Sequence, residues 1–163
     1  MQLIANDEPR MSANECYAYF ALRGFPMKPE EVSTALSLKP SDTWSAGDPH
    51  RVPGKKREYN YWRIESRIAR EARVDLEDHV KDVLAQLAPC FDVAATLSKQ
   101  YQGLMELVGY FHEYYPGLNF EPTTMQQLAA LGVSVDCDFY YLAPNEDVLS
   151  DRRPHSAPRF RQA

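Results

Sequence analysis

Residues 104–142 read LMELVGYFHEYYPGLNFEPTTMQQLAALGVSVDCDFYYL, and they contain the pattern that decides the fold. Apolar and polar side chains alternate through Leu104–Tyr114, as in a strand with one buried face. Pro122 suits the first position of a helix, and Gly132 suits its carboxyl end. Alternation returns in Val133–Leu142. The stretch therefore predicts a strand, a helix and a second strand.

The same signals continue toward the amino terminus. A proline opens a helix after the first strand, and its apolar spacing resembles that of the helix at Pro122, which indicates a faint internal repeat. The elements expected there are a strand at 17–23, a helix that begins at Pro29 and ends before Pro40, a long loop at 41–56, a strand at 58–68, a helix at 76–87 and a shorter helix at 91–100. We predict an α+β fold: a mainly antiparallel sheet with helices on one face, in a ferredoxin-like or pseudo-duplicated β-α-β arrangement.

A chain of 163 residues with 44% hydrophobic and 25% charged residues suits one domain with a sizeable core. We expect a flexible segment at 1–15, a single domain at 16–142, and a disordered or loosely draped tail at 143–163. The tail is rich in proline and arginine and poor in apolar residues.

Charge and cysteine content narrow the classes of partner and compartment. The net charge of −5 argues against binding to nucleic acid or to an anionic membrane, because both need clustered lysine and arginine. Three widely spaced cysteines and the lack of an apolar export signal favour the cytoplasm. A basic ligand or a protein is the partner that fits better.

Alternation assigns the strand residues to two faces of the sheet. The apolar face is expected to form the core under the helices, and it comprises Phe20, Leu22, Trp62, Ile64, Met105, Leu107, Phe111, Val133, Val135, Cys137 and Phe139. The other face collects seven of the ten tyrosines with charged residues: Tyr17, Tyr19, Arg23, Tyr59, Tyr61, Arg63, Glu65, Arg67, Glu106, Tyr110, His112, Tyr114, Asp136, Asp138 and Tyr140. Such a face resembles a recognition surface. It is equally consistent with a scaffold, since tyrosine and cross-strand ion pairs stabilise any half-exposed sheet.

The loop before the second long strand is the other candidate site. Trp44, Asp48, His50, Arg51 and Arg57 lie close together there in the sequence. Tryptophan with two arginines and an acid can hold an anionic or planar ligand. The alternative is structural: Trp44 anchors the loop to the core, while Asp48 and Arg51 fix its turns.

Motifs for catalysis and for cofactors are missing from the sequence. The histidines and cysteines have no zinc-ligand spacing, and no nucleophile-elbow or nucleotide-binding glycine motif occurs. We therefore predict no catalytic residue, no metal site and no cofactor. Asp136 and Asp138, about 6.5 to 7 Å apart on one strand, are interpreted as partners in surface ion pairs. Cys137 is expected to be a buried thiol, and His79 to lie on a solvated helix face.

Several of these segments together resemble one bacterial protein family. The residues that carry the resemblance are Tyr19-Phe20-x-Leu22-x-Gly24, the helix from Pro29 to Pro40, Thr43-Trp44-x-x-Gly47-Asp48, Trp62, and Leu128-x-x-Leu131-Gly132-x-x-x-Asp136-x-Asp138-Phe139-Tyr140. This order, over about residues 16–142, is similar to the domain-of-unknown-function family 4279. The resemblance implies a cytoplasmic α+β protein, and some members sit among candidate immunity proteins of bacterial toxin systems. It implies no activity.

These observations favour a non-catalytic binding or interaction module over an enzyme, with an immunity-type role as the finer hypothesis. The partner would be a toxin or another protein, held by the tyrosine-rich face or by the Trp44 loop, and a homodimer is a further possibility. The alternative is a small-ligand binder or hydrolase-like enzyme centred on Trp44, Asp48, His50, Arg51 and Asp138. The candidate binding residues are Trp44, Asp48, His50, Arg51, Arg57, Tyr61, Arg63, Tyr110, His112, Asp136, Asp138 and Tyr140.

Overall fold

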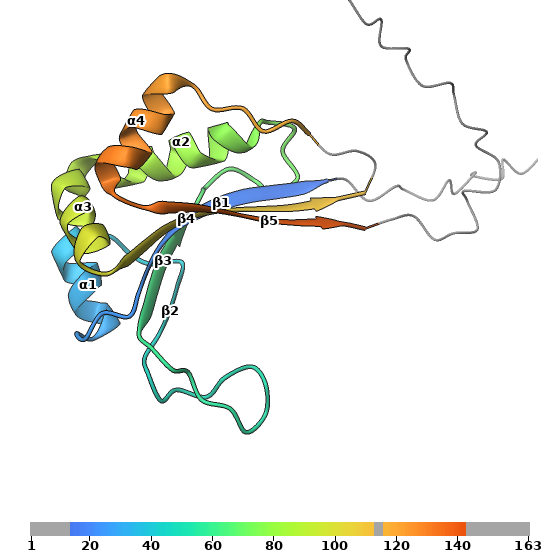
Figure 1. The fold of residues 1–163 in the computed structure, drawn as a ribbon. Coiled ribbons are helices and arrows are strands. Elements are labelled where there is room, and N and C mark those ends of the chain that lie inside the picture. The colour runs from blue at the N-terminus through green and yellow to red at the C-terminus, as the bar shows by residue number, and fades with distance from the viewer. Residues whose placement is uncertain (1–13, 113–115, 143–163) are drawn as a thin grey trace, which may run out of the picture.

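The computed structural model describes residues 14–112 and 116–142, so the expected amino-terminal segment, except for its last two residues, and the expected tail lie outside the described part. The elements of the described part are shown in Figure 1. They are β1 (Glu15–Arg23), α1 (Pro29–Leu36), β2 (Asp42–Trp44), β3 (Tyr61–Glu65), α2 (Leu76–Leu87), a 3₁₀ turn (Ala88–Cys90), α3 (Phe91–Gln100), β4 (Gln102–Phe111), α4 (Pro122–Leu131) and β5 (Ser134–Tyr141).

The strands form one five-stranded sheet in the order β2-β3-β1-β4-β5. Every neighbouring pair is antiparallel except β4 and β5, which are parallel and joined through α4. Figure 1 shows the helices gathered on one side of the sheet. The predicted α+β class, with a mainly antiparallel sheet and helices on one face, is confirmed. The two helices that open with proline both join strands that run parallel: α1 joins β1 to β2, with β3 between them in the sheet, and α4 joins β4 to the adjacent β5.

The core lies between the sheet and the helices, where strand alternation placed it. Phe20, Trp62 and Met105 are fully buried there, and their burial contributes on the order of 2 kcal/mol for each large side chain. Trp62 also satisfies its indole N–H, which donates a 2.9 Å hydrogen bond to the Ser33 hydroxyl in α1. Within the described part, no helix is both long and apolar enough to cross a membrane.

Two predicted core positions are wrong. Val135 and Cys137 have the core-facing parity, but Val135 is 43% exposed and Cys137 is also exposed. Both belong to β5, an edge strand that pairs with β4 on one side and with no described strand on the other. Alternation identified the face correctly, although it carries no information about whether a helix covers that face.

His79 is a third correction, because it lies in the core and not on a solvated helix face. The residue has no exposed surface, and its Nδ1 lies 2.9 Å from the hydroxyl of Ser66, just after β3. Its Nε2 is buried and has no hydrogen-bond partner in the described part of the chain. Burial lowers the pKa of the His79 imidazole, because the charged form is penalised most in an apolar environment.

The buried imidazole predicts a specific pH dependence of stability. The folded-state pKa of His79 lies below its ordinary value, so the unfolded chain takes up the proton first as pH falls. The free energy of unfolding should therefore keep its full His79 contribution above about pH 6.5 and lose up to ~1.4 kcal/mol per pH unit below it. Urea unfolding measured between neutral pH and pH 5 should show this decline in the wild type and not in His79→Leu.

A Ser66→Ala variant is the matched control for this prediction. It keeps the buried imidazole and should therefore keep the decline, because burial and not the serine hydroxyl is the main cause of the lowered pKa. Equal slopes for the wild type and His79→Leu would contradict the assignment.

Candidate functional site

The loop between β2 and β3 is an ordered hairpin. Gly47 and Arg57 are bridged by a 2.8 Å bond from the Gly47 N–H to the Arg57 carbonyl, and the Arg57 N–H donates to the Asp48 carbonyl. Further along, the His50 N–H donates to the Lys55 carbonyl at 2.9 Å. Asp48 closes the first turn, since its carboxylate accepts the Ser45 N–H at 2.7 Å. Figure 1 shows the hairpin projecting beyond β2 and β3, away from the helices.

Asn60 ties the base of this hairpin to the turn between β1 and α1. Its side-chain oxygen accepts the Ala46 N–H at 2.8 Å, and its amide nitrogen donates to the carbonyls of Phe25 and Met27 at 3.0 and 2.9 Å. One side chain thus satisfies three backbone groups from two segments that are distant in sequence. Such cross-linking restricts the hairpin relative to the sheet.

A stack of three side chains holds the hairpin against the sheet. Trp44 on β2 and its cross-strand neighbour Tyr61 on β3 are parallel, with ring centroids 3.9 Å apart and an interplanar angle of 6°. The guanidinium carbon of Arg57 lies 3.9 Å from the Trp44 ring centroid. Two groups cannot share one ring face at that distance, so Tyr61 and Arg57 cover opposite faces of the indole. The ring faces of Trp44 are therefore taken, and a planar ligand cannot stack on them.

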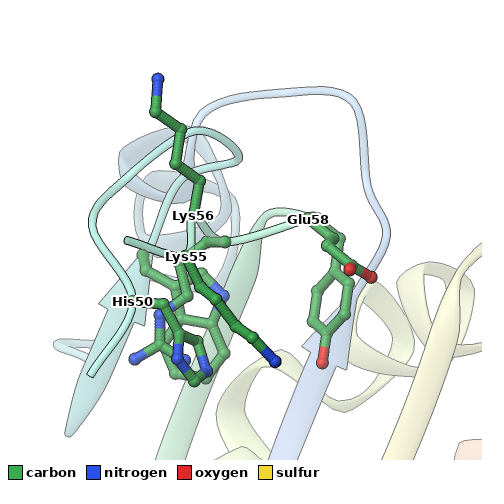
Figure 2. Close-up of a pocket in the computed structure, with 7 residues that line it drawn as sticks. His50, Lys55, Lys56 and Glu58 are labelled. Atoms are coloured by element: carbon green, nitrogen blue, oxygen red, sulfur yellow. The ribbon is translucent and has the colours of Figure 1, made fainter. Parts of the chain in front are cut away.

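The hairpin encloses a small, cationic pocket of about 270 Å³. Its lining residues, drawn in Figure 2, are Trp44, His50, Lys55, Lys56, Arg57, Glu58 and Tyr59. The side chains of His50 and Lys55 point to the same side, whereas Lys56 points the opposite way. The Nδ1 of His50 accepts the Val52 N–H at 3.0 Å, which leaves Nε2 to carry the proton and to act as a donor.

Within the described part of the chain, the cations of this hairpin form no ion pair with an acidic side chain. Among residues 14–112 and 116–142, ion pairs join Arg63, Arg67, Arg70 and Lys81 to nearby carboxylates, and none involves Arg51, Lys55, Lys56 or Arg57. Unpaired cations on a protein of net charge −5 form a local positive region.

The tyrosine-rich face, by contrast, largely satisfies itself. Arg70 lies over Tyr17 and Arg63 over Tyr19, with guanidinium carbons 3.9 and 4.7 Å from the ring centroids. Tyr17 and Tyr61 are buried although no helix covers them. The hydroxyl of Tyr19 is hydrogen-bonded to Glu106 and Tyr61, and burial together with these contacts raises the pKa of Tyr19. Tyr59 lies in the hairpin and lines the pocket, and Tyr114 falls outside the described residues.

The remaining candidate residues cluster at the far edge of the sheet. Tyr110 on β4 and Tyr140 on β5 stack with centroids 5.1 Å apart, and the Tyr140 hydroxyl donates to Asp138 at 2.7 Å, which raises the pKa of Tyr140 to about 12. Asp136 lies opposite Glu106 in the strand register. Burial raises the pKa of Glu106, and the nearby Asp136 and Asp138 raise it further. His112 follows β4, where its N–H donates to the Asn14 side chain.

Asp138 does not join the hairpin residues, as the small-ligand or enzyme alternative required. It lies on β5, whereas Trp44 lies on β2, and three strands separate them. At about 4.8 Å per strand the two edges are roughly 19 Å apart. Within the described part, no group of three or more His, Cys, Asp or Glu side chains is arranged to hold a metal ion.

Comparison with known proteins adds a family to this geometry. Residues 14–142 match the model of a domain of unknown function, DUF4279. The chain belongs to this family. No curated protein and no solved structure matches it. The DUF4279 match spans β1 to β5, so the hairpin, the tyrosine-rich face and the acidic edge all lie within the family domain.

Sequence reasoning missed several residues that shape the hairpin of this DUF4279 domain. Lys55 and Lys56 line its pocket, and Asn60 fixes its base. A signal for the lysines was available, because residues 50–57 read HRVPGKKR, a strongly basic run in an acidic chain. No local signal marks Asn60, whose partners Phe25 and Met27 are distant in sequence.

The stack predicts that Trp44 contributes more to stability than a neighbouring aromatic residue of the same hairpin. Trp44→Leu removes the contacts with both Tyr61 and Arg57 and should lower the free energy of unfolding by about 1–3 kcal/mol. Tyr59→Leu is the control: Tyr59 is 39% exposed and has no aromatic or cationic stacking partner in the described part, so its loss should cost less than about 0.5 kcal/mol. Urea unfolding measures both, and equal losses would refute the role of the stack.

Proposed function

We propose that this protein is a non-catalytic binding module and that its hairpin holds an acidic region of a partner protein. The observation that carries the proposal is the set of hairpin cations that form no ion pair with any described residue, on a hairpin that is already ordered. An ordered loop loses little conformational entropy on binding, so more of its interaction energy appears as affinity. Unpaired surface cations also accelerate encounter with an acidic surface.

The size and layout of the pocket favour a protein surface over a small ligand. Its volume of about 270 Å³ falls below the range of roughly 300–1,000 Å³ that is usual for small-molecule sites. It is large enough to admit a carboxylate side chain. Because Lys55 and Lys56 point to opposite sides of the hairpin, the cations fit an extended acidic surface better than one compact anion.

A small-anion binder remains the second candidate, since His50 and Lys55 point to the same side and Arg57 lines the same pocket. This candidate needs only those three side chains and makes no use of Lys56.

For the first candidate, the resemblance to a family in which some members sit among candidate immunity proteins suggests a bacterial toxin as the acidic partner. In that case the domain would act by occupying the toxin's surface, and it would need no chemistry of its own.

Charge reversals on the hairpin test the proposal. Binding of a short oligoglutamate peptide, followed by NMR titration at low salt, should shift amide signals of residues 47–59. Lys55→Glu and Lys56→Glu should each weaken this binding about threefold to tenfold, because each reversal replaces an attraction by a repulsion. Lys39→Glu changes an equally exposed lysine outside the hairpin by the same charge and should leave the affinity close to that of the wild type.

Inorganic phosphate distinguishes the second candidate. If phosphate binds and both probes depend on Lys55 but not on Lys56, the site is a small-anion site. If the peptide shifts no hairpin signal, or if Lys39→Glu weakens binding as much as the hairpin variants do, the proposed role of the hairpin is wrong.

A further inference from the structure

The edge strand β5 offers backbone groups for pairing with another strand. It pairs with β4 on one side, and no described residue pairs with its other side. The Leu142 N–H donates to the Phe111 carbonyl of β4. Backbone groups alternate in direction along a strand, so those of residues 135, 137, 139 and 141 point away from β4. An exposed edge of this length is a template for an added strand.

The core-facing side of β5 adds an apolar strip to this edge. Val135 and Tyr141 are 43% and 48% exposed, and Cys137 between them is exposed as well. On this side of the inner strands, large apolar side chains such as Phe20 and Met105 are fully buried, whereas these β5 side chains are exposed. An added strand would cover them with its own apolar side chains.

The opposite side of β5 is acidic. Asp136 and Asp138 lie there beside Glu106 of β4. The positive charge of Arg23 lowers the pKa of Glu106, against the effect of the two aspartates. The raised pKa of Glu106 reflects its burial and the repulsion among these carboxylates. Added positive charge would relieve that repulsion.

The charges select against a second copy of this chain as the added strand. In an antiparallel pair of two β5 strands centred on Cys137, Asp136 of one copy would lie opposite Asp138 of the other, and like charges in that position are destabilising. The β2 edge of a second copy is short, and it carries Asp42. The same charges would attract a basic strand, so they give specificity as well as protection of the edge.

We propose that β5 accepts an extended segment of a partner protein in which basic and apolar side chains alternate. Its basic side chains face Asp136, Asp138 and Glu106, and its apolar side chains cover Val135 and Cys137. The Cys137 N–H, now held by the Asp136 carboxylate at 3.0 Å, turns to the incoming strand and frees that carboxylate for a basic side chain. This surface is separate from the hairpin, so the proposal does not depend on the function proposed above.

Titration with a short synthetic peptide of alternating lysine and valine tests the proposal, with a peptide of alternating glutamate and valine as the control. In the wild type, the lysine peptide should shift the NMR amide signals of residues 134–142, and the glutamate peptide should shift none of them. Asp136→Asn with Asp138→Asn should weaken lysine-peptide binding about tenfold, because two charge pairs are lost.

Val135→Pro tests the backbone part of the proposal without changing a charge. The N–H of residue 135 points away from β4, so proline removes a bond to the added strand and leaves the bonds to β4 in place. Binding should be lost, while amide signals outside β5 stay at their wild-type positions. Persistence of binding in this variant, or shifts spread over the hairpin, would overturn strand addition. Dimerisation through β5 in sedimentation would identify a second copy as the occupant and would also overturn the proposal.

Discussion

In the described part of the chain, helices cover only one face of the sheet, so the aromatic side chains of the other face pack against one another, against small apolar neighbours such as Ala21 and Leu104, and against the charged side chains beside them. Arginines from the loops that follow β2 and β3 fold back over this face. Arg57 covers Trp44, and Arg70 covers Tyr17. This arrangement buries Tyr17 and Tyr61 without a second layer of helices. It also explains why a face so rich in tyrosine is a poor candidate for a broad recognition surface, since most of its ring area is already used.

The two edges of this sheet, which helices cover on one face only, differ in charge. At the β2 edge, the stack of Arg57, Trp44 and Tyr61 fixes a hairpin whose other cations remain unpaired among the described residues. At the β5 edge, Asp136 and Asp138 face the open side, while Val135 and Cys137 lie on a side that the helices leave bare. The sheet of this DUF4279 domain thus separates a basic hairpin from an acidic strand by roughly 19 Å. These two separate surfaces of opposite charge are the basis on which we propose a domain that binds partners, and not one that converges side chains on a reacting atom.

Much of the fold could be predicted because its signals are local. Prolines opened α1 and α4, a glycine closed α4, and period-two alternation assigned Trp62 and Tyr61 to opposite faces. The predictions that were wrong concern burial, which depends on how elements distant in the sequence pack together. Cys137 has core parity but no helix above it. The burial of His79 had a partial signal, since it lies three residues after Leu76 and four before Val83 on the apolar stripe, whereas its partner Ser66 could not be read from helix periodicity.

The candidate site divides in the same way. Trp44, Asp48, His50 and Arg57 do lie together in the hairpin, because one continuous segment, residues 44–57, carries them all. Grouping Asp138 with them was wrong, because the strand order of the sheet places Asp138 at the opposite edge. The alternation of side chains along one strand does not predict that order.

The proposed function requires that the free protein already holds its cationic hairpin in a fixed geometry. Backbone ¹⁵N relaxation of the hairpin tests this most directly, because it reports motion on the timescale at which an unanchored loop would move. We expect order parameters near 0.85 for residues 45–50 and 55–60, close to those of β3. Values below about 0.6 throughout these residues would show a flexible loop and would contradict it.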